Sequence, residues 1–333
     1  MKNLMARLNL RTVLIFCLLT LLFSFWSDRP AQSWGFWAHK RINRLAVFTL
    51  PPEMIGFYKK HIEFLTEHAV DPDKRRYATE DEAGRHFIDI DHYGTYPFPE
   101  MPRRWDDAIA KYSEDTIKEY GIVPWHTQLM LYKLTRAFEQ KDVSQILHLS
   151  ADIGHYIGDG HVPLHTTENY NGLKTNQRGI HGFWESRIPE LYGEEYDYWV
   201  GKADYIKKPL DEIWTYVLES HLALDSVLTF ERELNARFPP DQKKCYEARG
   251  ATTMEVYCEG YTHAYSDELE GMVERRMRRA ILHVGSFWYT AWVNAGKPDL
   301  NNIGPYAPTP EEQREQEELE KKFEAGQSKG RKC

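Results

Sequence analysis

The chain has 333 residues, 42% of them hydrophobic, which is enough for one sizeable globular core or for two domains. Its formal net charge is −8, and this excludes the basic balance of a protein that holds nucleic acid mainly through its phosphates. An acidic protein does suit a site that gathers several divalent cations.

The first 33 residues are typical of a secretion signal. A start rich in Lys and Arg precedes an apolar run over 13–23, and the small residues Ala31 and Ser33 place cleavage between Ser33 and Trp34. An uncleaved membrane anchor is the alternative, but the run is shorter than the roughly 20 residues that a spanning helix needs. We expect a secreted or periplasmic protein that begins at Trp34. Its net charge is −11, because the leader takes a net +3 away from −8.

The rest of the chain is predicted to be helical, because apolar residues recur at three- to four-residue spacing and no run alternates as strands do. The helical patterns cover Glu53 to Ala69, Ala108 to Tyr120, Thr127 to Gln140, Val143 to Gly158, Asp211 to Phe238 and Ser266 to Trp292. Beyond Pro305 the composition is charged and poor in large apolar residues, which is typical of a frayed helix or a disordered tail. We expect an all-α fold with one domain over 34–304 and a tail over 305–333.

The cysteines allow one internal disulfide in the mature chain. Cys17 lies in the leader and Cys333 ends the chain, whereas Cys245 and Cys258 bracket a short loop. These two can pair in an oxidising compartment.

The segment "HYIGDGHVPLH" is the densest cluster of chemistry-bearing residues. Its His155 and Asp159 are four residues apart, so a helix places them on one face, and His165 follows the proline that ends the helix. The segment "HGFWE" repeats the spacing with His181 and Glu185. Imidazole and carboxylate ligands without thiolates are typical of catalytic zinc. One such pair is more often a helix-surface contact, but two pairs with a histidine between them predict metal binding.

Two upstream segments carry further candidates. "HAVDPDKRRY" contains Asp71 and Asp73, and "RHFIDID" contains His86, Asp89 and Asp91. Asp-Pro-Asp is also a common turn, and a histidine before an apolar run is usually a core residue. Neither segment predicts a site when it is taken alone.

Taken together, the motifs resemble the trinuclear zinc phosphoesterases. "W-x4-H" at the expected mature start, "PDxxR", "HFID", "HxxxDxHxPLH" and "HxxWE" occur in the order of that superfamily. It contains the single-strand-specific zinc nucleases of fungi and plants and the bacterial zinc-dependent phospholipases C. The resemblance covers most of the chain from Trp34 to Trp292. It implies an all-α domain with three zinc ions at the bottom of a cleft.

The resemblance also implies which residues hold the three ions. The implied ligands are the α-amine and carbonyl of Trp34 with His39 and Asp159 for one ion, Asp73, His86, His155 and Asp159 for the second, and His165, His181 and Glu185 for the third. An α-amine has a pKa of about 8, low enough for zinc to displace its proton. In the uncleaved precursor the same nitrogen is an amide, so cleavage before Trp34 is expected to complete the site.

Two positions depart from the family pattern. Asp73 is the expected ligand because only Asp73 gives "PDxxR", which places Arg76 where the family has an arginine at the phosphate. Asp71 is the alternative, since it lies 15 residues before His86, as in some of the nucleases. Glu185 stands where the nucleases often have Asp and the phospholipases have Glu.

Three clustered zinc ions without redox chemistry predict hydrolysis of a charged ester. Arg76 is expected to stabilise charge on the phosphate, Asp73 or a neighbouring carboxylate to orient the nucleophile, and Asp159 to bridge two ions. In the nuclease version of "HFID", Phe87 stacks on a base and Asp89 binds the edge of that base. The alternative is that Phe87 belongs to the core and Asp89 caps a turn.

We therefore predict a zinc-dependent phosphodiesterase, and first a nuclease that cuts single-stranded DNA or RNA to 5′-phosphorylated products. The sequence implies no stable protein partner. A phospholipase C acting on phosphatidylcholine-type headgroups is the second interpretation, and it needs an apolar rim. The aromatic candidates for that rim are Trp34, Phe36, Trp37, Tyr93, Tyr96 and Phe98. A non-catalytic exported zinc-binding protein is the third, and Arg76 argues against it because metal storage needs no phosphate-facing arginine.

Overall fold

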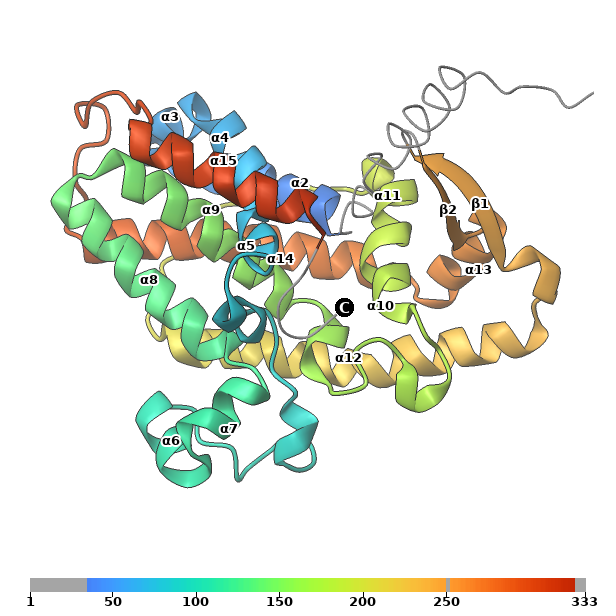
Figure 1. Ribbon diagram of the computed structural model, residues 1–333. Helices are drawn as coiled ribbons and strands as arrows, with labels where there is room; N and C mark the ends of the chain where they lie inside the picture. Colours follow the sequence, from blue (N-terminus) through green and yellow to red (C-terminus); the bar gives the residue numbers. More distant parts are fainter. Residues whose placement is uncertain (1–34, 250–251, 327–333) are drawn as a thin grey trace, which may run out of the picture.

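The computed structural model describes residues 35–249 and 252–326 (Figure 1). The chain is 69% helical, and the strands of the described part form a single antiparallel hairpin. The predicted all-α, single-domain fold is therefore confirmed. No helix in the described ranges is long and apolar enough to cross a membrane. The predicted leader, Trp34 and Cys333 lie outside the described residues.

The elements follow one another as helices joined by short turns. The α-helices are α2 (Phe36–Ala46), α3 (Pro52–Lys60), α4 (Ile62–Glu67), α5 (Asp71–Arg75), α6 (Trp105–Tyr112), α7 (Glu114–Glu119), α8 (Val123–Gln140), α9 (Val143–Gly160), α10 (Ile180–Gly182), α11 (Ile188–Tyr192), α12 (Pro209–Arg237), α13 (Glu259–Glu268), α14 (Met272–Asn294) and α15 (Pro310–Glu324). The strands are β1 (Lys244–Arg249) and β2 (Thr252–Tyr257). A π-helical turn, Phe183–Arg187, joins α10 to α11. The 3₁₀ turns are Val47–Thr49, His68–Val70, Glu80–Arg85, Ile90–Tyr93, Pro163–Thr166, Leu173–Thr175, Gly193–Glu195 and Pro240–Gln242.

The hydrophobic core surrounds α9, which contacts α8, α14 and α2 (Figure 1). Trp288 of α14 is fully buried, and its indole N–H donates to the carbonyl of Ser150 on α9 at 3.0 Å. Tyr58 of α3 stacks on Trp288, and its hydroxyl pairs with Oγ of Ser150 at 2.9 Å. Because buried tyrosine and tryptophan polar atoms need partners, these bonds fix how α3 and α14 lie against α9.

Two glycines let α2 and α9 approach each other closely. A Cβ at Gly154 would lie 2.0 Å from Oδ1 of Asn43, and a Cβ at Gly158 would lie 2.9 Å from Nδ1 of His39. The side-chain amide of Asn43 donates to the carbonyl of Ala151 on α9 at 3.0 Å. This contact places His39 against the C-terminal half of α9.

Three predicted helices are each divided into two in the structure, and they are 53–69, 108–120 and 266–292. The first divides at His61, between α3 and α4. The second divides at Ser113, where a φ of 71° ends α6 and the hydroxyl accepts the N–H of Thr116 to begin α7. The third divides at Gly271, where φ is 73°. Each break leaves the apolar spacing nearly intact, which is why the spacing alone did not predict it.

The hairpin of β1 and β2 was not predicted, because its apolar alternation is short and consists mainly of Met254 and Val256 on β2. Cys245 of β1 and Cys258, the residue after β2, form the predicted disulfide. The ring of Tyr257 stacks on Phe183 with 3.7 Å between centroids, so the hairpin lies against the π-helical turn. The disulfide is compatible with an extracellular protein.

The charged C-terminal region contains α15, which packs against α5 (Figure 1). Thr309 and Glu312 form a capping box at the start of this helix. Near its end, Phe323 is buried and meets the rings of Phe36 at 5.7 Å and Tyr77 at 5.1 Å. The disordered alternative for the tail is therefore wrong over α15, because the helix is capped and buries an aromatic side chain. The packed domain continues past the predicted boundary at residue 304.

Gly154→Ala is expected to lower the free energy of unfolding by about 1–3 kcal/mol, because the added methyl group has no room beside Asn43. Gly260→Ala in α13 is the matched control: a Cβ there meets nothing within 4 Å, and alanine is the better helix former. Urea unfolding followed by circular dichroism measures both. Equal unfolding free energies for the two variants would contradict the close approach of α2 and α9.

Candidate metal centre

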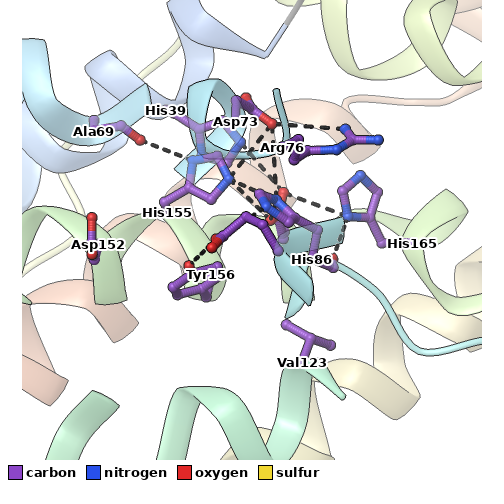
Figure 2. Close-up of polar contacts among 12 residues, drawn as sticks. His39, Ala69, Asp73, Arg76, His86, Val123, Asp152, His155, Tyr156 and His165 are labelled. Carbon is purple, nitrogen blue, oxygen red and sulfur yellow. Dashed lines mark hydrogen bonds and ion pairs between the residues drawn. The ribbon is translucent and has the colours of Figure 1, made fainter. Parts of the chain in front are cut away.

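The C-terminal half of α9 carries the two residues around which the site is built. His155 and Asp159 are 0% and 2% exposed, and His155 Nε2 lies 3.2 Å from Oδ2 of Asp159. The two side chains therefore share one helix face, as their spacing predicted. Figure 2 shows ring nitrogens and carboxylates from several segments converging on this position.

Three groups of ligand-type side chains meet here, and the candidate ligand atoms of each group lie within 4.8 Å of one another. The groups are His39, His155 and Asp159; Asp73, His86 and His155; and His165, His181 and Glu185. Every described residue of the three predicted ligand sets lies in one of these groups. The structure thus brings together side chains that are up to 146 positions apart, from residue 39 to residue 185.

The two carboxylate oxygens of Asp159 face different partners. Oδ1 lies 3.4 Å from Nε2 of His39 and 3.5 Å from Nδ1 of His165. Oδ2 lies 2.9 Å from Nδ1 of His86 and 3.2 Å from Nε2 of His155. One buried carboxylate therefore contacts four imidazoles, two through each of its oxygens.

In the second group, two ring nitrogens point at each other. Nδ1 of His86 and Nε2 of His155 are 3.0 Å apart, and each is 3.9 Å from Oδ1 of Asp73. Two atoms bound tetrahedrally to zinc at 2.0–2.1 Å lie about 3.3 Å apart, so this spacing fits donors to one ion. Asp71 faces elsewhere, with Oδ2 2.5 Å from Nδ1 of His68. The geometry favours Asp73 over Asp71 in this group.

The third group consists of His165, which follows α9, and of His181 and Glu185 from the segment "HGFWE". Nε2 of His165 and Nε2 of His181 are 2.9 Å apart, and Oε2 of Glu185 lies 3.2 Å and 3.0 Å from them. His181 and Glu185 were expected on one α-helix, but Glu185 lies in the π-helical turn. Pro189 has no N–H to bond the carbonyl of Glu185, and the preceding N–H reaches back five residues instead.

Backbone carbonyls hold two of the histidines in a fixed orientation. Nδ1 of His155 lies 2.9 Å from the carbonyl of Ala69, and Nδ1 of His165 lies 2.7 Å from the carbonyl of His86. A ring whose Nδ1 donates to a carbonyl presents the lone pair of its Nε2 on the other side. His155 and His165 therefore turn Nε2 toward their own groups.

A buried carboxylate behind His86 was not identified from the sequence. Glu82 is 0% exposed, and Oε1 lies 3.6 Å from Nε2 of His86. It also contacts Arg85 at 2.6 Å, Arg75 at 3.5 Å and the hydroxyl of Tyr156. In the sequence, the four-residue spacing between Glu82 and His86 is the one feature that could have indicated this contact. The surrounding segment otherwise resembles a charged surface turn.

The charged groups of the site stabilise one another against burial. Burial alone raises the pKa of Asp159, but the positive charges of His155 and His165 hold that pKa well below its ordinary value. The pKa of Glu185 is also lowered, because the two histidines of its group outweigh burial. A carboxylate buried as deeply as that of Asp159 stays ionised only beside positive charge, which imidazolium rings or a bound cation can supply.

A small cleft opens beside the groups, and its polar and aromatic lining is Arg76, His86, Phe87, His165, Tyr170 and His181. Nη1 of Arg76 lies 4.0 Å from Oδ1 of Asp73, so a guanidinium stands next to the second group (Figure 2). The cleft therefore combines candidate ligands with a cation suited to phosphate.

Of the predicted base-binding pair, Phe87 and Asp89, one residue lines the cleft. Phe87 is 8% exposed and lines the cleft. Asp89 is 6% exposed, its N–H donates to the carbonyl of Tyr120 at 2.7 Å, and it is not part of the cleft lining. Tyr170 does line the cleft and meets the ring of His181 edge-on at 6.0 Å. Sequence reasoning missed Tyr170, because one tyrosine in a polar loop gives no signal.

The first described residue lies against two of the groups. Gly35 has a left-handed φ of 64°, and a Cβ there would lie 3.3 Å from Cδ2 of His39 and 3.8 Å from Oε1 of Glu185. Trp34, which the resemblance makes a ligand through its α-amine, lies outside the described residues. The described chain therefore begins at the candidate centre.

The donor set fits metal binding. It consists of imidazole nitrogens and carboxylate oxygens without thiolates, which suits zinc and related transition-metal ions. These groups can therefore hold metal ions. No protein-family model matches the chain, and no curated protein matches it.

Glu82→Gln is expected to weaken zinc binding by about 10- to 100-fold, the usual effect of removing a carboxylate that orients a ligating histidine. Glu80→Gln is the matched control, because Glu80 is exposed in the same 3₁₀ turn. Competition with a chromogenic zinc chelator measures both affinities, and thermal unfolding confirms that both variants fold. Identical affinities in the folded variants would show that Glu82 does not support His86.

Proposed function

We propose that the protein is a secreted, zinc-dependent phosphodiesterase with three zinc ions. The observation that carries the proposal is the position of Asp159, whose two oxygens face separate sets of histidines. A carboxylate in this position is suited to bridging two neighbouring cations, and paired metal ions are a recurrent device for hydrolysing phosphate esters. The third group adjoins them through His165, 3.5 Å from Oδ1 of Asp159.

The proposed ligands follow the three groups. They are Trp34, His39 and Asp159 for the first ion, Asp73, His86, His155 and Asp159 for the second, and His165, His181 and Glu185 for the third. When bound, zinc supplies a water molecule of lowered pKa and neutralises charge on the phosphate. Asp159 would be a ligand of both the first and the second ion.

Arg76 and Asp73 provide the remaining chemistry from the chain itself. The guanidinium of Arg76 lines the cleft, where it can bind the non-bridging oxygens of a phosphate. Its positive charge would stabilise the negative charge that develops on these oxygens in the transition state. Asp73, 4.0 Å from Arg76, is placed to orient the nucleophile and to hold the guanidinium. A protein that only stored metal would not need this arginine, so the non-catalytic alternative has less support.

The substrate we propose is single-stranded nucleic acid. Phe87 and Tyr170 both line the small cleft that contains Arg76, so aromatic side chains adjoin the proposed position of the phosphate. Base stacking on an aromatic side chain contributes about 1–3 kcal/mol per base. Asp89 has no part in this proposal, because it lies away from the cleft lining.

The phospholipase alternative loses most of its expected aromatic rim. Tyr93 and Phe98 are 6% and 1% exposed, and Phe36 packs against Phe323 of α15. Among the described rim candidates, only Tyr96, at 48% exposed, is a largely exposed aromatic residue. Glu185 remains the feature that resembles the phospholipases, and a direct comparison of substrates distinguishes the two activities.

Asp159→Asn is expected to lose most of its zinc and to lower kcat/KM by at least about a hundredfold, because two ions lose a shared ligand. Asp267→Asn is the matched control, since Asp267 forms an exposed i,i+4 pair with His263 at 2.9 Å. Zinc-loaded protein beginning at Trp34 is offered single-stranded DNA and phosphatidylcholine side by side. Near-normal turnover by the Asp159 variant would contradict the proposal.

The products identify the substrate class. Nucleic acid cut to 5′-phosphorylated fragments supports the nuclease, whereas release of phosphocholine supports the phospholipase C. Protein that binds zinc and cleaves neither substrate supports the non-catalytic alternative.

Phe87→Leu is expected to lower kcat/KM on single-stranded DNA by about tenfold, within the range of one lost stacking contact. Its zinc content should stay unchanged, because Phe87 offers no ligand atom. Phe48→Leu is the matched control, since Phe48 is 54% exposed and does not line the cleft. Equal rates for the two variants would remove Phe87 from substrate binding.

A further inference from the structure

A fourth group of ligand-type side chains lies outside the centre described above. His68, Asp71 and His148 place candidate ligand atoms within 4.8 Å of one another. His68 belongs to the 3₁₀ turn before α5, Asp71 begins α5, and His148 lies on α9. We propose that this group is a separate metal site that binds one divalent transition-metal ion, such as zinc, through two imidazoles and one carboxylate.

The carboxylate of this group is buried and already contacts one of the two histidines. Asp71 is 4% exposed, and its Oδ2 lies 2.5 Å from Nδ1 of His68. Oδ1 accepts a long hydrogen bond of 3.3 Å from the side chain of Gln316 on α15. Burial alone raises the pKa of Asp71, but His68, Lys74 and Arg75 hold that pKa below its ordinary value, so the carboxylate is ionised and suited to bind a cation.

The second histidine has an unsatisfied donor or acceptor. Nε2 of His148 is buried and has no hydrogen-bond partner among the residues that the structure describes. Buried polar atoms are normally paired, so an orphan nitrogen beside a histidine–carboxylate pair requires an explanation. One ring nitrogen of His148 lies within 4.8 Å of the candidate ligand atoms of His68 and Asp71, and a neutral imidazole nitrogen in that position can bind an ion.

Aromatic packing holds both rings in place. The ring of His68 stacks on Phe64 with 3.9 Å between centroids, and the ring of His148 meets Phe64 edge-on at 4.9 Å. Tyr306 adds an edge contact with His148 at 6.4 Å. An apolar shell around converging polar atoms is typical of metal sites, because it fixes the ligands and limits access of water.

The group opens into a cleft whose other wall is α15. His68 and His148 line this cleft together with three glutamates of α15, Glu312, Glu317 and Glu320. Glu312 accepts from Ser144 and Glu320 pairs with Lys74, so these contacts anchor α15 to the body of the protein. An acidic opening favours the entry of a cation and disfavours an anionic ligand.

The fourth group is a site of its own, although it shares two elements with the proposed centre. His148 precedes His155 by seven residues on α9, which is two turns or about 10 Å. Asp71 precedes Asp73 by two residues on α5. An ion bound here would hold α5 against α9, on the element that carries Asp73. The inference does not depend on the proposed function, because none of the three ligands belongs to the catalytic groups.

The test is a difference in zinc content between variants of the full mature chain. Zinc-saturated, dialysed protein is analysed by elemental mass spectrometry. The His148→Asn variant is expected to contain one zinc ion fewer per chain than the wild-type protein. This difference does not depend on how many ions the wild type binds in total. His263→Asn is the matched control, because His263 also pairs with an aspartate, at 2.9 Å, but lies exposed without a third ligand. It should retain the full zinc content.

A second variant guards against misfolding and sharpens the test. The His68→Asn variant is expected to bind one zinc ion fewer than the wild type. The double variant, His68→Asn with His148→Asn, is also expected to bind only one fewer, because both histidines belong to one site. Near-UV circular dichroism confirms the fold. Unchanged zinc content in any folded variant, or two ions lost in the double variant, would overturn the proposal. Asp159→Asn separates the two claims, since it affects the catalytic groups and should leave the fourth ion bound.

Discussion

The carboxylate of Asp159 is 2% exposed and contacts four imidazoles, from His39, His86, His155 and His165. A charge so far from water is stable only when opposite charge surrounds it, and breaking such a cluster is costly. The four histidines come from α2, the turn before residue 87, α9 and the turn after α9. Each of these segments must therefore arrive within about 4 Å of one carboxylate.

Two kinds of contact hold these segments in place: close helix packing and hydrogen bonds or ion pairs to neighbouring elements. Gly154 allows α2 to lie directly on α9, which carries Asp159. The π-helical turn that carries Glu185 is held from outside, since Arg187 donates to the carbonyl of Tyr257 at 2.9 Å and pairs with Glu247 on β1. The hairpin is closed by its disulfide, so it acts as a brace for the third group. Positions of ligand atoms are thus fixed by contacts well outside the groups themselves.

The sequence predicted the fold class and the local pairs, because both depend on short-range spacing. His155 with Asp159 is such a pair, and the four-residue interval needs only a helix to bring the side chains together. The assembly of the groups from distant segments was implied by the family resemblance alone. Glu82 and Tyr170 escaped prediction because their roles depend on tertiary contacts that no local pattern encodes. The break at Ser113 and the start of α15 do have local signals, a capping serine and a capping box, but apolar spacing alone does not register them. The fourth group joins segments about 80 residues apart, which no local pattern encodes.

The most direct test of this account is anomalous diffraction at the zinc absorption edge, on crystals of zinc-loaded protein that begins at Trp34. The account predicts two strong peaks at ligand distance from Asp159, about 2.0–2.2 Å, one on the side of His39 and one on the side of His86 and His155. It also predicts a third peak among His165, His181 and Glu185. A map in which no peak lies within ligand distance of Asp159 would contradict the bridging role and, with it, the proposed chemistry.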